Sequence, residues 1–423
     1  MFKLYDKKIH IEIFYYLLII YSFSIPLWRN ITPIVIILLY INWFFEMDFK
    51  NKFHRIIKKP LFFYFIAFTL FYIVHYLGFI NTSNFEFARF DAEIKMCFLL
   101  FPILLFSTNL DFIDHKKLKI IFLAYIIGCF ISFAISVINS LILYYKTNEI
   151  MWFFYVYISY FYHSSYISMY IVFAIGLICY LLIENKIRNK IFKILLIFLA
   201  ILFSAYIILL SSKAGLISLI ISVCLIYIYL LIKRKKVLKY SSYFILSISI
   251  IYLGINSIPK SINRLTPALE AVRAEKRDIN MEDGTVQRIE IWKCSAELLI
   301  ENPVLGVGTG DVKDELFRKY DEKGMKFAKS FKLNSHNQYL QTSAALGIIG
   351  LISLIAMFLI PLIFAIRNKN YIYIFFLIIV GFSILVESMF ENQAGVLFYT
   401  FFNSFLFLMS NRLSSENKNL LKQ

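Results

Sequence analysis

The sequence contains few of the residues from which disulfides and metal sites are built. Among its 423 residues there are five cysteines and six histidines. Four cysteines fall inside long apolar runs, where they serve as small packing residues, and only Cys294 lies in a polar region, so no intrachain disulfide is expected there. The histidines are scattered, with neither an HxxxH nor a CxxC spacing, and we therefore expect no metal site.

Charged residues are also scarce. They make up 17% of the chain, whereas hydrophobic residues make up 60%, and the mean hydropathy is +0.71. This composition excludes a soluble globular protein and indicates an all-α polytopic membrane protein. The formal net charge is +17. Because the basic residues gather between apolar runs, we interpret this charge as a signal of membrane topology and expect no nucleic-acid partner.

About twelve apolar runs are long enough to cross about 30 Å of hydrocarbon as helices. They lie near residues 11–28, 31–46, 60–80, 92–107, 120–144, 164–183, 191–211, 214–232, 241–258, 338–366, 371–389 and 393–410. Polar residues interrupt two of these runs: one begins with Glu93 and Lys95, and the last contains Asn403. The first run lacks a small-residue cleavage site and is expected to remain as a span.

The distribution of Lys and Arg predicts the orientation of the chain. With the N-terminus in the cytoplasm, the inside segments hold more than half of the 44 basic residues. We therefore expect a bundle of about nine spans over 1–258 and a long periplasmic loop over 259–337. About three further spans and a cytoplasmic tail are expected over 338–423, with both termini in the cytoplasm.

The long loop is expected to be mainly helical. Gly284 offers a helix start, and Asn302 with Pro303 ends that helix. Its apolar stripe is expected at Ile289, Trp292, Ala296 and Leu299.

A second short helix is expected over 311–323, and Asn334–Ser335 is expected to cap the helix that re-enters the membrane. Between the two loop helices, Gly306, Gly308 and Gly310 predict a flexible turn. They do not predict a nucleotide-binding loop, since no strand precedes them and the sixth-position glycine and the Walker lysine are lacking.

Aromatic residues crowd into 151–162, beside a predicted outer boundary. This segment reads either as an interfacial belt or as a platform for sugar rings or a lipid tail, and the sequence leaves both interpretations open.

His336 and Arg288 are the first candidates for chemistry. At a helix start the dipole penalises an imidazolium, which favours the neutral ring that can take a proton from an attacking hydroxyl. Arg288 lies in the first turn of a helix, where a cation is disfavoured, and this misfit indicates an anionic ligand nearby. Its guanidinium can hold diphosphate oxygens as a bidentate fork. The alternative is an exposed arginine paired with Glu282 or Asp283.

Two further residues lie at predicted outer boundaries. The ammonium of Lys213, in a tight turn between two runs, either reaches the headgroups or contacts a phosphate. Glu387 lies at the outer end of an apolar run and is expected either to form an ion pair with one of these cations or to cap the span.

These residues fall in a recognisable pattern. It consists of Arg288-x-x-x-Trp292, Glu-Asn-Pro-Val-Leu-Gly-Val-Gly at 301–308, Ser-His-Asn-Gln-Tyr-Leu at 335–340 and Gly-Ile-Ile-Gly at 347–350. The pattern, the many spans and the single long loop resemble the O-antigen ligase and O-antigen polymerase family of bacterial envelope glycan enzymes. The motif region covers about 285–350, and outside it the resemblance is one of general character.

The resemblance implies transfer of a glycan from undecaprenyl diphosphate to an acceptor hydroxyl at the periplasmic face of the inner membrane, without metal, nucleotide or other cofactor. It implies that His336 is the general base and that Arg288 binds the diphosphate. Lys213 stands where the family usually has arginine, and it supplies a point charge instead of a fork. Arg89 and Arg264, near the predicted outer face, are assigned to the diphosphate with less motif support.

The acceptor distinguishes the members of such a family. A ligase moves finished glycan to lipid A-core, a polymerase extends the lipid-linked chain, and protein O-glycosylation is a third use of the same donor. We favour the ligase because the chain has a single long outer loop and no extended C-terminal domain. A flippase or other transporter of lipid-linked glycan is the rival from another class. Against it, no internal repeat is visible, and ionisable residues cluster at the predicted outer boundary.

Overall fold

The computed structural model describes residues 7–27, 30–184, 187–258 and 284–420, with side chains described as far as residue 410. Throughout these residues the chain forms helices and no strand, which confirms the predicted all-helical class. The physical reason is that apolar segments facing hydrocarbon have no water for their backbone groups, and a helix satisfies those groups within one segment.

The chain begins with α1 (Lys7–Ser24), α2 (Ile31–Phe45), α3 (Phe49–Ile57), α4 (Leu61–Leu77), α5 (Phe85–Lys95), α6 (Cys97–Ser107), η1 (Leu110–Phe112), α7 (His115–Thr147), η2 (Ile150–Phe153), α8 (Tyr155–Ile158) and α9 (Ser164–Ile183). It continues with α10 (Lys190–Leu209), α11 (Lys213–Arg234), α12 (Val237–Asn256), α14 (Gly284–Glu301), α15 (Val312–Glu322), α16 (Lys326–Ser330), α17 (Gln338–Arg367), α18 (Tyr371–Val386), η3 (Met389–Glu391) and α19 (Gln393–Leu420).

The expected number of about twelve spans is not confirmed. In the described residues, seven helices are long and apolar enough to cross a membrane, or eight if the bent pair α2 and α3 forms one span. They are α7, α9, α10, α11, α12, α17 and α19. Other expected runs form helices shorter than the ~20 residues that a span needs. Thus α4 has 17 residues and α18 has 16, while the expected run 92–107 is divided at Met96 between α5 and α6.

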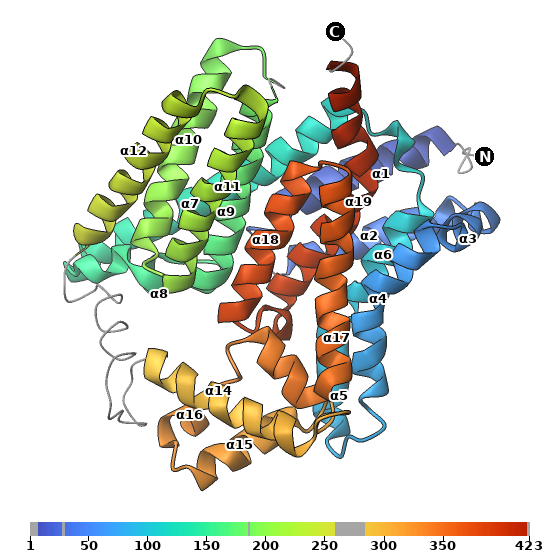
Figure 1. Cartoon of the computed structure of the whole chain (residues 1–423), viewed down its shortest axis with the longest axis vertical. Helices are drawn as coiled ribbons and strands as arrows, with labels where there is room; N and C mark the ends of the chain where they lie inside the picture. Colours follow the sequence, from blue (N-terminus) through green and yellow to red (C-terminus); the bar gives the residue numbers. More distant parts are fainter. Residues whose placement is uncertain (1–6, 28–29, 185–186, 259–283, 421–423) are drawn as a thin grey trace.

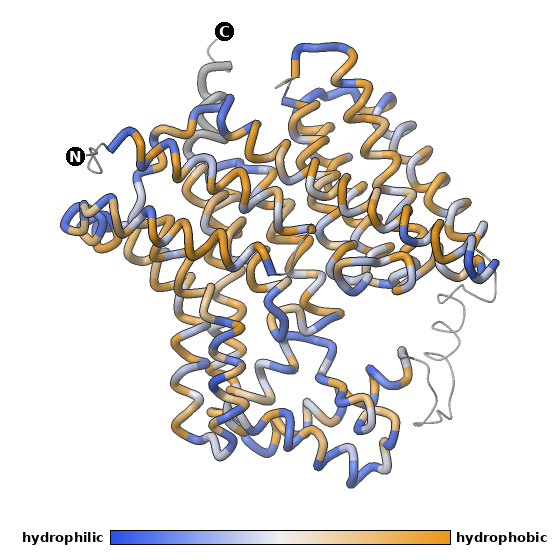
Figure 2. The backbone as a smooth tube through the Cα atoms, turned by 180° about the vertical axis from the view of Figure 1, so that it is seen from behind, coloured by the Kyte–Doolittle hydropathy of each residue, from blue (hydrophilic) through white to orange (hydrophobic). Residues whose placement is uncertain are grey.

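The expected domain boundaries and the side of the membrane on which each part lies stay predictions, and residues 259–283 lie outside the described residues. Figure 1 shows α9 to α12 grouped at one side of the molecule and α4 beside α17 at the other, with α18 and α19 between them. Helices α14 to α16 lie at one end, beneath this bundle. Figure 2 shows apolar residues along the bundle and hydrophilic ones concentrated at the helix ends and in α14 to α16.

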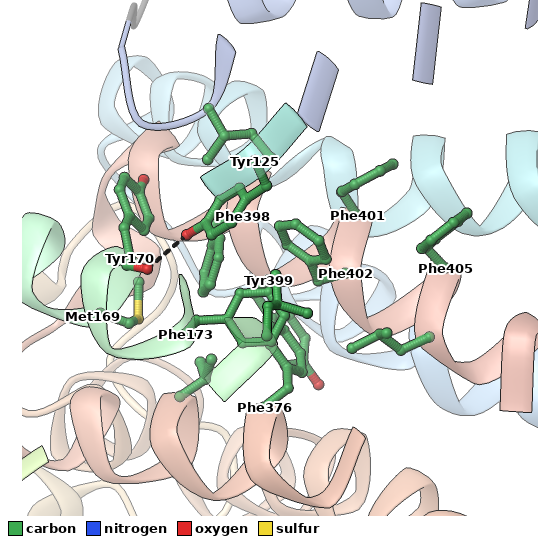
Figure 3. Close-up of a cluster of buried hydrophobic side chains, with 14 of the residues drawn as sticks. Tyr125, Met169, Tyr170, Phe173, Phe376, Phe398, Tyr399, Phe401, Phe402 and Phe405 are labelled. Carbon is green, nitrogen blue, oxygen red and sulfur yellow. Dashed lines mark hydrogen bonds between the residues drawn. The ribbon is translucent and has the colours of Figure 1, made fainter. Parts of the chain in front are cut away.

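Helix α19 lies at the centre of the core. Its aromatic side chains interlock with those of α9 and α18 (Figure 3), and the rings of Phe402 and Phe173 are 4.8 Å apart. The polar Asn403, which weakened this run as a predicted span, is buried and accepts a 2.6 Å hydrogen bond from the Tyr373 hydroxyl. A buried amide is tolerated in the central helix α19 because Tyr373 on α18 donates a hydrogen bond to it.

The described part of the expected loop, 284–337, is helical, as its pattern predicted. Helix α14 begins at Gly284 and ends before Asn302, and α15 falls within 311–323. The predicted apolar stripe of α14 is wrong. The buried side chains of α14 are instead Val286, Gln287, Ile291, Cys294, Ser295 and Leu298, and of these Ile291, Cys294 and Leu298 pack in one apolar cluster with residues of α15, α16 and α17. Cys294 and Ser295 therefore face the interior, while Trp292 is only partly buried.

The glycine segment after α14 is docked against α17, which corrects the expectation of a flexible turn. The N–H groups of Val307 and Gly308 donate to the carbonyls of Ala344 and Ala345 at 3.0 and 2.9 Å. Helix α17 breaks at Gly347, where φ is 60° and ψ is −154°, so these carbonyls are released from the helix. Such backbone-to-backbone contact requires glycine, since a Cβ on Gly306 would lie 2.4 Å from the Ala345 backbone.

We expect Gly306→Ala to destabilise the protein several times more than Gly324→Ala. Both glycines have a φ of +67°, but a Cβ at Gly324 meets nothing within 4 Å. The Gly324 change therefore costs only the left-handed backbone penalty of about 1 kcal/mol, whereas the Gly306 change also separates the glycine segment from α17. Thermal unfolding of the purified proteins in detergent measures the difference. Equal losses would show that this docking does not hold the loop in place.

Candidate active site

Glu387, at the end of α18, joins two of the predicted site residues. Its side chain is 9% exposed, and its backbone is extended where the helix stops. Oε1 lies 2.7 Å from His336 Nδ1, and Oε2 accepts a 3.0 Å bond from Arg288 Nη2. Arg288 also donates through Nη1 to the carbonyl of Val386 at 2.6 Å. Residues from three distant segments of the chain thus form one charged cluster.

His336 lies in the short loop before α17 and not in the first turn of that helix. The N-cap is Asn337, whose side chain accepts from the Leu340 N–H, so the predicted cap at Asn334–Ser335 is wrong. Asn334 instead accepts from the backbone N–H of His336 at 3.0 Å and stabilises its left-handed backbone, with φ of 44°. The tautomer and orientation of the imidazole are therefore set mainly by its contact with Glu387 and less by the dipole of α17.

Two loops are clamped together behind this cluster. The N–H of Asn337 donates to the Ser388 hydroxyl at 3.0 Å. Gln338 donates through Nε2 to Glu391 at 2.9 Å and accepts through Oε1 from the Phe390 N–H at 2.8 Å. These bonds join the loop that carries His336 to the loop that carries Glu387, so the distance between the two side chains is fixed by buried hydrogen bonds.

A buried cation stabilises the clamp. Lys95, whose side chain is 1% exposed, lies 3.1 Å from Glu391 and also pairs with Asp91 on its own helix, α5. Sequence reasoning used Lys95 only as a reason to doubt a span and did not consider Glu391. Both residues are ionisable and lie beside apolar runs. Because ionisable residues occur in such positions only when they are paired, their occurrence there predicts a buried ion pair.

The charges around Glu387 keep it ionised. Its burial opposes ionisation, but the hydrogen bond from His336 and the charges of Arg288 and His163 outweigh burial and lower the pKa of Glu387 to about 2. An ionised carboxylate accepts the Nδ1–H of the His336 ring, and this tautomer leaves Nε2 with a lone pair. His163, at the N-cap of α9, was not predicted as a member of this cluster.

Lys213 approaches the same helix from α11. Its ammonium donates to the hydroxyl of Thr285, which precedes Arg288 by one turn of α14. Ser212 caps α11 through a hydrogen bond to the N–H of Gly215, so the Ser-Ser-Lys-Ala-Gly turn fixes where the lysine side chain leaves the helix. The start of α14 therefore has one guanidinium and one ammonium near it.

Comparison with known proteins agrees with the motif pattern. Residues 198–355 match the model of a family described as O-antigen ligase. This part of the chain belongs to the O-antigen ligase family. The match includes Lys213, Arg288 and His336, while Glu387 lies beyond it.

The chain is also similar to a Haemophilus influenzae protein described as uncharacterized, with 28% identity over 207 residues. That similarity covers 47% of this chain and 49% of the relative, so the chain spans about half the length of the curated relative it matches. With the family and the apolar helices together, the protein is a multi-pass membrane protein.

The two remaining predicted site residues, Arg89 and Arg264, are not joined to the cluster in the described part of the chain. Arg89 is exposed on α5, and among the described contacts none links it to Arg288, His336 or Glu387. Arg264 lies outside the described residues. The spacing of basic residues along a sequence does not say which of them point into one site, and for Arg89 the helix directs the side chain away from the protein.

We expect Glu387→Gln to destabilise the protein at neutral pH by up to about 3 kcal/mol, because a folded-state pKa lower than the usual value stabilises the fold. This contribution is complete above the ordinary pKa of 4.5 and is lost as the pH falls to about 2. In thermal unfolding, the gap between the native protein and the variant should therefore close over that range. Glu86→Gln, on the exposed side of α5, is the control. A gap independent of pH would contradict the ionised cluster.

Proposed function

We propose that this protein transfers a glycan from undecaprenyl diphosphate to a hydroxyl of lipid A-core at the periplasmic face of the bacterial inner membrane. The observation that supports this most is the cluster of Arg288, His336 and Glu387, of which Arg288 and His336 lie in the region matching the O-antigen ligase family. A base and a cation held by one carboxylate suit a reaction that removes a proton from an acceptor and releases an anionic leaving group.

His336 is the general base in this proposal. Its Nδ1–H donates to Glu387, and its Nε2 accepts the proton of the acceptor hydroxyl as the oxygen attacks the anomeric carbon. One C–O bond forms while the bond from that carbon to the diphosphate oxygen breaks, so the anomeric centre inverts. Glu387 touches no substrate and acts as a positioning residue that sets the tautomer and direction of the ring.

Arg288 binds the leaving diphosphate. A guanidinium has five N–H donors, and the bonds to Val386 and Glu387 use Nη1 and Nη2. The donors that remain suit phosphate oxygens, and the side chain is 31% exposed. Lys213, which donates to Thr285 on the same helix, is a second candidate for binding the diphosphate, and Arg89 and Arg264 stay weaker candidates for the same ligand.

The orientation in the membrane follows from the distribution of Lys and Arg and places both termini in the cytoplasm. Helices α14 to α16 then lie on the periplasmic side, where lipid-linked glycans are transferred in such families. No metal, nucleotide or other cofactor enters the proposal, because the leaving group is already activated as a diphosphate.

We expect His336→Ala to lower the rate of glycan transfer by about 10²- to 10⁴-fold, the usual contribution of a general base. Transfer from a labelled lipid-linked glycan to lipid A-core, measured with purified protein in detergent, tests this. Gel filtration and thermal unfolding establish that the variant is folded. Transfer at the native rate by a folded variant would exclude His336 as the base.

Arg288→Lys should lower transfer by at least about tenfold although the charge is kept, since the bidentate fork is lost. Arg318→Lys on α15 is the matched control, because Arg318 is exposed and pairs with Glu315 and Glu322 in its own helix. Equal turnover in the two variants would show that Arg288 serves only to hold Glu387.

The acceptor is tested in a strain that lacks the protein. Undecorated core together with long lipid-linked polymer supports the ligase. Single repeat units on the core would instead assign the protein as a polymerase that uses the same donor. If the purified protein moves labelled lipid-linked sugar across vesicle membranes and transfers none, the protein is a transporter and neither a ligase nor a polymerase.

A further inference from the structure

A cavity lined by charged and aromatic side chains lies beside the loop that carries His336, and neither base nor diphosphate binding accounts for it. It has a volume of about 190 Å³ and is enclosed by α5, α15, the 332–334 loop, Gln341 of α17 and Glu391. This is smaller than the about 300–1,000 Å³ of typical small-molecule sites, so the cavity suits one sugar ring and not an oligosaccharide.

The inner wall of this cavity is acidic. Asp91 and Glu391 both line it, and both pair with Lys95, which lies behind them. Asp91 is 4% exposed, and its Oδ2 is buried and accepts no hydrogen bond in the described part of the chain. The ion pairs with Lys95 fix both side chains at the wall, and a carboxylate oxygen that faces the cavity accepts hydrogen bonds from hydroxyl groups.

The outer wall carries lysines and phenyl rings. The ammonium of Lys313 lies 5.3 Å from the centre of the Phe87 ring, and both residues line the cavity. Lys332 and Phe90 also line it and are exposed, so they form its mouth. A sugar is bound through its hydroxyl groups by carboxylates and amides, and through the C–H face of its ring by aromatic side chains. The two lysine ammonium groups of this wall favour a sugar that carries an acidic substituent.

The cavity shares a wall with the loop that carries His336. Asn334 lines the cavity and accepts from the backbone N–H of His336 at 3.0 Å. Gln341 lines it as well, and its Oε1 accepts from the N–H and hydroxyl of Ser335. In Figure 1, α5 lies next to α17, whereas α11, which carries Lys213, lies on the other side of the molecule. The cavity is therefore joined to the loop that carries His336 through Asn334 and Gln341.

We propose that this cavity binds one sugar ring of the acceptor glycan, and that the ring carries a carboxylate or phosphate. The inference rests on the proposed function, since it assigns the acceptor side of the same site. Asp91, Asn334 and Gln341 bind hydroxyl groups, the Phe87 and Phe90 rings pack against the ring face, and Lys313 and Lys332 bind the acidic group. A neighbouring hydroxyl of the bound glycan is thereby brought to His336.

Direct binding tests this without any transfer reaction. Saturation-transfer NMR on the full chain in detergent micelles is recorded with glucuronic acid, glucose 6-phosphate and glucose as probes. We expect a signal from at least one acidic sugar that exceeds the glucose signal several-fold. It should fall at least fivefold in the Lys313→Glu/Lys332→Glu double variant and in Phe90→Ala, and it should persist in His336→Ala. The two acidic probes distinguish a carboxylate from a phosphate.

Two matched controls separate the cavity from general effects of charge and surface. Lys293→Glu changes an exposed lysine of α14, and Phe85→Ala removes an exposed ring of α5, and neither residue lines the cavity. Both should leave the signal unchanged. A signal from neither acidic sugar, or one equally strong in the cavity variants, would overturn the proposal. So would complete displacement of the signal by inorganic pyrophosphate, since the sugar would then occupy the donor site.

A transfer assay gives the second measurement. In the cavity variants the KM for the acceptor should rise about tenfold while kcat at saturating acceptor is kept, since no group at the reacting atoms is changed. Loss of kcat with an unchanged KM would contradict a binding role. Because the NMR signal does not depend on turnover, failure of the cavity assignment and failure of the proposed reaction are measured separately.

Discussion

The candidate site depends on one buried carboxylate. Glu387 contacts both the imidazole of His336 and the guanidinium of Arg288, and its own helix ends at that point. A carboxylate that is 9% exposed is stable as an ion only when cations and donors surround it. The requirement is mutual, because without Glu387 the arginine would lose a charged partner and the imidazole would lose the acceptor that sets its tautomer.

This contact is possible only because the surrounding backbone is rigid. The loop before α17 and the loop after α18 are joined through Asn337, Gln338 and Ser388, and Lys95 holds the far end of that connection through Glu391. On the other side of α17, the break at Gly347 releases carbonyls that accept from the glycine segment after α14. Arg288 and His336 are therefore placed by two sets of contacts that both depend on the same helix, α17.

In the proposed function, the polar residues around α14 to α16 serve two substrates. Toward α11 the charged side chains are Lys213 and Arg288, which suit an anionic lipid headgroup. Toward α5 the cavity offers carboxylates, amides and aromatic rings, which suit hydroxyl groups. His336 is linked to both, through Glu387 to Arg288 and through Asn334 to the cavity. An enzyme that joins a lipid-linked donor to a separate acceptor needs such an arrangement, since both substrates must reach one base from different directions.

A large part of this was available from the residues alone. Hydropathy predicted the all-helical class and the seven longest spans, and the helix breakers Asn302 and Pro303 predicted the end of α14. The motif pattern identified the family and, with it, Arg288 and His336. These features are local: each depends on residues within a few turns of one another, so periodicity and composition report them.

The tertiary structure decided everything that joins distant segments. It turned α14 so that Cys294 and not Trp292 faces the core, ended several apolar runs before they reached the length of a span, and made Glu387 a partner of two residues that lie about 50 and 100 positions away. It also brought Lys95 to Glu391 and left Arg89 outside the cluster. The reason is that pairing between buried charges depends on distances between helices. A linear sequence shows which charges need a partner and does not show which residue that partner is.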